Sequence, residues 1–430
     1  MTQPIRTYAL LSLVLVAAAM CGRSKPSPAE HWVATWTTAQ ELAPSTQEKA
    51  TLPPGLQMPD FSTMRGPRPS HAAPSIADGQ TIRMIVHTSI GGSKLRIELS
   101  NAFGKESVLI GDARIAIRRQ GSSIDPRSDR QLTFGGGRSF NIGAGINLIS
   151  DPIDLEVDPT ADLAVSLFVL KGGNAPTYHA IGLHTGYVVD GDQTASAELL
   201  HPASTTAYAW LRSVDVAASK DGFAIACLGD SITDGYGTTN DANQSWPALL
   251  ARRLLDRGKG QNIAVVNEGV SGNEVLRDGA GVSALARLDR DIFSTPGVKW
   301  VILLEGINDI NLHGQVRGPN ALTSEDLIRG YRQIIARSHL LGIKVAGATL
   351  TPEQGVWLAQ DEGEETRLKV NRWIRTGGAF DAVIDFDAIL RDQSDPSKLR
   401  GEYDPGDHIH PNDLGNAAMA DSIDLAKFTD

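Results

Sequence analysis

The sequence predicts an all-β domain of the sandwich or jelly-roll type, followed by an α/β domain built on a parallel sheet. First, residues 81–200 contain many short runs of alternating apolar and polar residues, separated by Gly, Pro, Asn and Asp, which is typical of half-buried antiparallel strands. Second, continuous apolar runs alternate with helical stretches after Lys220, which favours a sheet with helices on both faces. Third, a chain of 430 residues is too long for one ordinary core.

The domain boundaries follow from changes in composition along the chain. We expect a signal peptide at residues 1–21, an N-terminal segment with a Pro-rich loop at 22–80, the β domain at 81–215 and the α/β domain at 219–430. In the runs 81–87 and 94–100, alternate residues are apolar and share one face. Gly91 and Gly92 lie between these two runs, and we expect them to form the turn of a hairpin.

Each element of the α/β domain has its own local signal. The strands expected from continuous apolar runs are residues 223–228, 262–267, 298–306, 343–350 and 382–386. The helices expected from apolar periodicity are residues 245–255, 324–342, 364–376 and a C-terminal helix from about Asn412. Ser245 is a candidate N-cap, and Gly342 a candidate stop signal. Strands and helices therefore alternate as in βαβ units, whose ligand sites lie beyond the carboxyl ends of the strands.

Polar residues gather after three of these strands and before the last helix. Ser231 follows the first strand within GDSITDG, and Gly272 follows the second within NEGVSGN. Asn308 follows the third strand within EGINDI, and Asp407 and His410 precede the last helix within GDHIHPN. Because all four groups fall at the edge where a site is expected, the pattern favours a functional site over four unrelated turns.

These residue types match the chemistry of ester hydrolysis by a serine, which requires a base, an acid that orients it, and donors for the oxyanion. Ser231 is the candidate nucleophile, His410 the base and Asp407 the orienting acid. The amides of Ser231 and Gly272 and the side chain of Asn308 are candidate oxyanion donors. Each residue alone also has a structural interpretation, as a turn serine, a tight-turn glycine or an Asn that caps a helix.

The two histidines near the C-terminus leave further alternatives open. His408 lies two positions before His410 and is a rival base. The pair could also ligate a metal ion, but the sequence shows no third ligand, no CxxC pair and no HExxH motif. We therefore expect neither a metal nor a cofactor.

Four short motifs resemble those of the SGNH (GDSL-type) hydrolases. They are GDS at 229–231, NxGxSG at 267–272, GxND at 306–309 and DxxHP at 407–411. The resemblance covers about the C-terminal half of the chain. It implies a flavodoxin-like three-layer α/β/α domain that hydrolyses acyl esters without a cofactor.

The same resemblance implies a role for each matched residue. Ser231 looks like the nucleophile and first oxyanion donor, and Gly272 and Asn308 look like the other two donors. His410, which precedes Pro and follows Asp407 by three positions, looks like the base with Asp407 as its partner. Two positions depart from the motif, because Ile232 replaces the usual Leu and His408 stands where Gly is frequent.

The β region narrows the expected substrate. Residues 81–104, ahead of a GDS motif, are similar to a secreted bacterial subfamily of arylesterases and acylhydrolases. That resemblance implies O-acetyl esters of carbohydrate as the substrate class. We accordingly expect a small-molecule or polysaccharide acyl ester substrate with a short acyl chain. Two other readings stay open: a lipid acylhydrolase (lysophospholipase-type) or acyltransferase, and a carbohydrate-binding surface protein with an inactive hydrolase domain.

The N-terminus predicts export to the periplasm or the extracellular space. Arg6 precedes an apolar run at residues 8–20, which has signal-peptide length and is too short to span a membrane. Cys21 is a candidate lipoprotein anchor, although Met20 is a poor residue at that position. Cys227 is then left alone, so we expect no structural disulfide. The formal net charge of −10 argues against nucleic acid or an anionic membrane as a partner.

Overall fold

The computed structural model describes residues 30–42, 73–173, 177–258, 263–313, 322–356, 358–359 and 361–428. The expected signal peptide, Cys21 and most of the Pro-rich loop lie outside the described residues. By its internal contacts, His31–Asp430 is one unit that contains both expected domains. Within the described ranges, no helix is long and apolar enough to cross a membrane.

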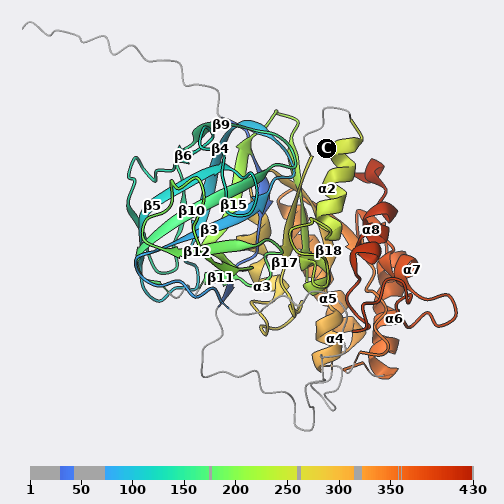
Figure 1. Cartoon of the computed structure of the whole chain (residues 1–430). Helices are drawn as coiled ribbons and strands as arrows, with labels where there is room; N and C mark the ends of the chain where they lie inside the picture. Colours follow the sequence, from blue (N-terminus) through green and yellow to red (C-terminus); the bar gives the residue numbers. More distant parts are fainter. Residues whose placement is uncertain are drawn as a thin grey trace, which may run out of the picture. The chain divides into compact units, whose positions relative to one another are not determined.

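The N-terminal part is built of antiparallel sheets (Figure 1). The larger sheet has the strand order β13 (Ala203–Thr205), β12 (Gly186–Asp190), β3 (Gln80–His87), β10 (Asp162–Lys171), β5 (Val108–Ile117) and β6 (Arg130–Gln131), with β7 (Phe140–Ile142) also paired to β5. The second sheet has the order β1 (Trp32–Thr37), β15 (Leu211–Ala217), β4 (Gly92–Ser100) and β8 (Asn147–Ile149), with β9 (Ile153–Val157) on β4. A short sheet has the order β14 (Tyr208–Ala209), β11 (Thr177–His179) and β2 (Glu41–Leu42).

The two large sheets share one apolar core, as the alternating pattern predicts. The fully buried residues of β3 and β4 in that core are Ile82, Met84, Val86, Leu95, Ile97 and Leu99. Ile85 of β3 points to the other face, where it packs in a smaller cluster with Ala164. The period of two in the sequence therefore marks which side of each strand is buried.

The expected hairpin at Gly91 and Gly92 is wrong. β3 and β4 do not pair with each other, because β3 belongs to the larger sheet and β4 to the second. The glycines lie where the chain crosses from one sheet to the other, and they allow the backbone to pass close to neighbouring strands. A Cβ on Gly91 would lie 2.3 Å from the Val157 carbonyl oxygen, and one on Gly92 would lie 2.9 Å from Cβ of Val216.

The C-terminal half contains a parallel sheet, as the continuous apolar runs predict. Its order is β17 (Ile263–Gly269), β16 (Phe223–Gly229), β18 (Val298–Leu304), β19 (Lys344–Ala348) and β20 (Ala382–Ile384). Every neighbouring pair in this order is parallel. Numbered along this half of the chain, the order is 2-1-3-4-5, which is the flavodoxin-like arrangement. The fold class expected from the sequence is thus confirmed.

Helices cover both faces of this sheet and complete three layers (Figure 1). Ile225 and Cys227 of β16 pack in a cluster with α2 (Trp246–Asp256), α7 (Phe386–Leu390) and α8 (Asp413–Ser422). Ala226 and Leu228, on the opposite face, pack with α3 (Ala284–Leu288), α5 (Ser324–Leu340) and α6 (Asp361–Thr376). Among the described residues, the remaining short helices are α1 (Ser231–Asp234), α4 (Ile307–His313), η2 (Asp289–Phe293) and η3 (Leu425–Lys427).

The β-rich part contacts the parallel sheet along the outer side of β17. Strand β1 lies against β17, and the amide of Ala34 donates to the carbonyl oxygen of Pro296 at 3.0 Å. The amide of Val265 in β17 donates to the Ser89 hydroxyl at 3.2 Å. Ala264 of β17 is buried in the core cluster of the β-rich part. Polar and apolar contacts therefore both join the two parts.

Candidate active site

Ser231 lies directly beyond the carboxyl end of β16, as the first residue of α1. The preceding residue, Asp230, caps this short helix: its Oδ1 accepts a hydrogen bond from the Ile232 amide at 2.9 Å. The chain passes from β16 to one neighbour and then returns to β18 on its other side. Ser231 therefore sits at the point where the strand order reverses, which is where open α/β sheets form ligand sites.

A chain of hydrogen bonds joins Ser231 to two residues from the loop before α8. Nε2 of His410 lies 2.8 Å from Oγ of Ser231, and Nδ1 of His410 lies 2.7 Å from Oδ2 of Asp407. The other oxygen of Asp407 accepts from the amides of Ile409 and His410, at 3.1 and 3.0 Å. These bonds fix the carboxylate, and the carboxylate in turn fixes the imidazole.

The charge state of Asp407 suits that arrangement. Burial raises the pKa of the Asp407 carboxyl, but the hydrogen bond and charge of His410, together with the two backbone amides, outweigh burial and hold the pKa below its usual value. An ionised carboxylate can only accept, so Nδ1 of His410 carries a proton. Nε2 is then free to accept the proton of the Ser231 hydroxyl. The ring of Tyr236 lies 4.4 Å from the His410 ring, centroid to centroid, and packs beside it.

His408, the rival base, has a different partner. Its Nδ1 lies 2.6 Å from Oδ2 of Asp404, and 47% of its side chain is exposed. His410 is the histidine that contacts Ser231. Among the described residues, no three His, Cys, Asp or Glu side chains are grouped so that they could hold a metal ion.

Two of the three candidate oxyanion donors, Gly272 and Asn308, lie in and against the loop after β17. Gly272 has a φ of +79°, in the left-handed region that favours glycine. The side-chain amide of Asn308, on α4, donates to the Asn273 carbonyl oxygen at 2.9 Å. The next residue, Asp309, accepts from the Val275 amide at 2.7 Å. Helix α4 thus holds the loop that carries Gly272.

Two backbone amides remain for a substrate oxygen. Within the described part of the chain, the amides of Ser231 and Gly272 donate to no protein acceptor. The structure brings Ser231, Asp407 and His410 into direct contact, and it links Asn308 to the residue after Gly272. That these donors stabilise an oxyanion stays a prediction.

Buried charged residues lie behind Ser231, and no local pattern in the sequence predicted their burial. Asp230, Glu305 and Asp309 are each at most 1% exposed, and burial raises the pKa of all three carboxyls. Arg287 of α3 is buried beside them and donates to the Gly229 carbonyl oxygen at 3.1 Å. The raised pKa values reduce the negative charge beside Ser231. Arg287 lies outside every helix and strand expected from the sequence, so no local pattern pointed to it.

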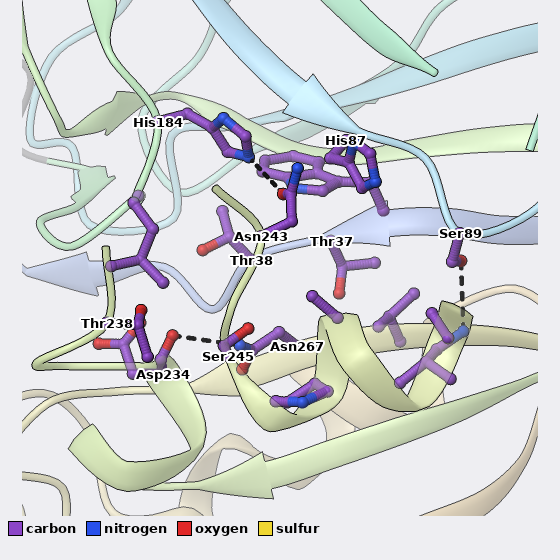
Figure 2. Close-up of a pocket in the computed structure, with 18 of the residues that line it drawn as sticks. Thr37, Thr38, His87, Ser89, His184, Asp234, Thr238, Asn243, Ser245 and Asn267 are labelled. Carbon is purple, nitrogen blue, oxygen red and sulfur yellow. Dashed lines mark hydrogen bonds between the residues drawn. The ribbon is translucent and has the colours of Figure 1, made fainter. Parts of the chain in front are cut away.

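A cavity of about 100 Å³ lies elsewhere, between the β-rich part and the parallel-sheet part. Figure 2 shows His87 and His184 on one side of it, with the Asn243 side chain beside His184, and Asp234 and Thr238 on the other. The three hydrogen-bonded residues Ser231, Asp407 and His410 do not line it. The cavity is therefore a feature of the contact between the two parts and not of the serine site.

The part of the chain that carries this site matches a known family. The model of the GDSL-like lipase/acylhydrolase family matches residues 227–418. Residues 227–418 form a GDSL-like lipase/acylhydrolase domain. The match runs from the end of β16 through both donor motifs to the loop with Asp407 and His410.

The GDSL domain also has named relatives. An acetylxylan esterase of Xylanibacter ruminicola is 32% identical over 234 residues, which are 50% of this chain and 45% of the relative. The chain thus spans less than half the length of that curated relative. Among solved structures, the acetyl xylan esterase AlAXEase is 21% identical, with a TM-score of 0.36 over 46% of this chain and 97% of that one. The M. smegmatis aryl esterase is 18% identical, with a TM-score of 0.36 over 46% of this chain and 95% of that one.

Proposed function

We propose that this protein is a carboxylic ester hydrolase that removes short acyl groups, above all acetyl groups, from carbohydrate. One observation carries the proposal: the unbroken hydrogen-bond chain from Oγ of Ser231 through His410 to Asp407. A serine that merely closes a turn does not need a histidine with an oriented carboxylate behind it. The GDSL-like family of the domain supports the same reaction class.

The geometry suggests how each residue acts. Nε2 of His410 takes the hydroxyl proton while Oγ of Ser231 bonds to the ester carbonyl carbon. The carbonyl oxygen becomes an oxyanion near the amides of Ser231 and Gly272 and the amide of Asn308; losing one such donor typically costs about 3–4 kcal/mol of transition-state stabilisation. The ester C–O bond then breaks, and His410 returns its proton to the departing alcohol. Asp407 holds the imidazolium that forms between these steps.

A water molecule completes the cycle. With the alcohol gone, Nε2 of His410 takes a proton from water, whose oxygen attacks the carbonyl carbon of the acyl-serine. The bond between that carbon and Oγ of Ser231 breaks, and Oγ recovers its proton from His410. The free carboxylic acid leaves, and none of these steps needs a metal or a redox cofactor.

The substrate class rests on the relatives. Acetylxylan esterase is the name of the curated relative, which is 32% identical over 234 residues. The proposal assigns acetyl groups on plant polysaccharide or its oligosaccharides as the natural substrate. A secreted location, in the periplasm or outside the cell, agrees with such a polymer and forms part of the proposal. Sequencing the N-terminus of the exported protein tests cleavage at residues 1–21, and mass spectrometry tests lipidation of Cys21.

The test compares the wild-type protein with Ser231→Ala on p-nitrophenyl acetate, butyrate and octanoate, and on acetylated xylan. We expect the wild type to prefer acetate and to release acetic acid from xylan, and the variant to lose both activities. A preference for octanoate would move the assignment to a lipid acylhydrolase. Equal rates for the two proteins, with no labelling of Ser231 by a serine-directed phosphonate, would mean that the hydrolase domain is inactive.

A further inference from the structure

His179 of the β-rich part lies against the GDSL domain in a fully buried position. It is the last residue of β11, and its side chain is 3% exposed. Its Nε2 lies 3.1 Å from Oδ1 of Asp234, in the helix that begins at Ser231. The contact joins residues 55 positions apart in the sequence.

Every polar neighbour of the His179 ring is an acceptor. Nδ1 lies 2.9 Å from the Ala39 carbonyl oxygen and 3.2 Å from Oε1 of Glu41. Nε2 faces the Ile181 carbonyl oxygen at 3.2 Å in addition to Asp234. Because both nitrogens face oxygens that only accept, both carry protons and the ring is a cation. Burial alone would lower the pKa of His179, but the charge and hydrogen bond of Asp234 raise it to about 9.

Asp234 connects His179 to the loop that carries Gly272. Its Oδ1 accepts from His179, and its Oδ2 accepts from the Ser271 amide at 3.2 Å and the Ser271 hydroxyl at 2.8 Å. Asp234 is 3% exposed, so an uncompensated negative charge there would be costly. The buried cation lies against Asp234 and offsets its charge, while the other oxygen of Asp234 holds both Ser271 donors. Ser271 directly precedes Gly272, a proposed oxyanion donor.

We propose that His179 is a positioning residue for catalysis: through Asp234 and Ser271 it fixes the backbone amide of Gly272. The proposal rests on the ester hydrolase function proposed above. It makes the β-rich part a component of the catalytic machinery, in addition to any role in binding carbohydrate. Nothing in the motifs of the GDSL domain supplies this cation, since it comes from a strand outside residues 227–418.

The loop needs this support because of where its other bonds lie. On the far side of Gly272, Asn308 holds the Asn273 carbonyl oxygen. On the near side, Asp234 holds Ser271. Gly272 itself donates to no acceptor among the described residues. The orientation of its amide is therefore set by its two neighbours, Ser271 and Asn273. Without the hydrogen bonds from Ser271 to Asp234, one of these two neighbours is no longer held in place.

The experiment measures kcat, KM and inhibitor affinity for His179→Gln and Asp234→Asn in the full chain. His179→Gln removes the cation, and Asp234→Asn places an N–H where His179 or Ser271 already donates. We expect kcat to fall by about 10- to 100-fold, since a displacement of about 1 Å at a reacting group can cost about 100-fold. KM should change by less than about threefold. Affinity for an alkyl boronic acid, which forms a tetrahedral adduct with the serine, should fall in parallel with kcat.

His184→Gln is the matched control. His184 also lies in the β-rich part, is buried, and hydrogen-bonds across to the GDSL domain, with Nε2 2.9 Å from Oδ1 of Asn243 (Figure 2). It has no contact with Asp234, so we expect its kcat to stay within about twofold of wild type.

Each outcome discriminates. If His179→Gln and Asp234→Asn keep wild-type kcat, the inference is overturned while the hydrolase assignment stands. If His184→Gln loses as much kcat as they do, the effect is general weakening of the contact, and the inference is likewise overturned. If His179→Gln does not fold, Asp234→Asn and the non-additivity of Asp234→Asn with Ser271→Ala carry the test. Wild type no faster than Ser231→Ala would instead refute the proposed function itself.

Discussion

Replacing Asp407 by Asn tests the proposed mechanism most directly, because it changes hydrogen bonding and charge with almost no change in shape. One carboxylate oxygen of Asp407 accepts from Nδ1 of His410 at 2.7 Å, and the other accepts from the amides of Ile409 and His410. An asparagine offers one acceptor and one donor in place of these two acceptors. Whichever way it turns, one side of the side chain places a donor against a donor.

The magnitude follows from the tautomer of His410. If the new amide N–H faces Nδ1, then Nδ1 must be unprotonated, and the proton sits on Nε2, 2.8 Å from Oγ of Ser231. The base is then unable to accept the hydroxyl proton. The equivalent change in a serine protease lowers kcat by about 10⁴-fold, and 10⁴-fold corresponds to about 5.5 kcal/mol of activation free energy. We expect Asp407→Asn to lose about 10³- to 10⁴-fold in kcat.

The assay is the initial rate of p-nitrophenyl acetate hydrolysis at several substrate concentrations, with circular dichroism to check folding. Asp404→Asn is the control, since Asp404 pairs with His408 at 2.6 Å in the same loop and neither residue contacts Ser231. This control should keep kcat within about threefold of wild type. A folded Asp407→Asn protein with more than a tenth of wild-type kcat would refute the role given to Asp407.

Three other predictions concern the donor loop, pH and the buried thiol. Gly272→Ala should lose about 100-fold in kcat, whereas Gly281→Ala, at a φ of +88° in the same region, bears similar backbone strain and should keep most of its kcat. Burial raises the pKa of Glu353 to about 8. Between about pH 5 and 8, the folded state therefore keeps a proton on Glu353 that the unfolded state has lost. The free energy of unfolding should fall by about 1.4 kcal/mol for each unit of rising pH because of this group. Glu353→Gln should remove this pH dependence, as measured by denaturation curves at several pH values. In a Cys21→Ser background, Cys227 should react with a thiol reagent only on unfolding, because it is fully buried and burial raises its pKa well above the usual value; rapid reaction of the native protein would contradict its burial.

Local patterns predicted most of the fold. Continuous apolar runs predicted each strand of the parallel sheet, and alternation predicted the buried face of β3 and β4. The meeting of Ser231 with His410, 179 residues later, was predictable because each lies beside an element with a clear signal. Parallel strands bring their carboxyl ends to one edge, so placing residues at those ends was enough to bring them together.

Features set by packing between distant elements were beyond the sequence. Gly91 and Gly92 have the composition of a hairpin turn, but which sheet each flanking strand joins depends on the whole core, and the two strands joined different sheets. His179 lies in a short strand with no periodic pattern, and nothing local connects it to Asp234. Long-range polar contacts of this kind depend on where side chains lie in three dimensions. No periodicity or motif spacing in a single sequence indicates them.

The contact along β17 has a consequence for self-association. β17 pairs with β16 on one side only, and its other side would offer unpaired backbone groups if it were bare. In this protein the Ser89 hydroxyl accepts from the Val265 amide, and Ala264 is buried in the neighbouring core. The β-rich part thus covers an edge strand that could otherwise pair with a strand of another molecule. A shortened chain that begins at the parallel sheet would expose that strand. We expect such a chain to aggregate even if Ser231 remains catalytically active.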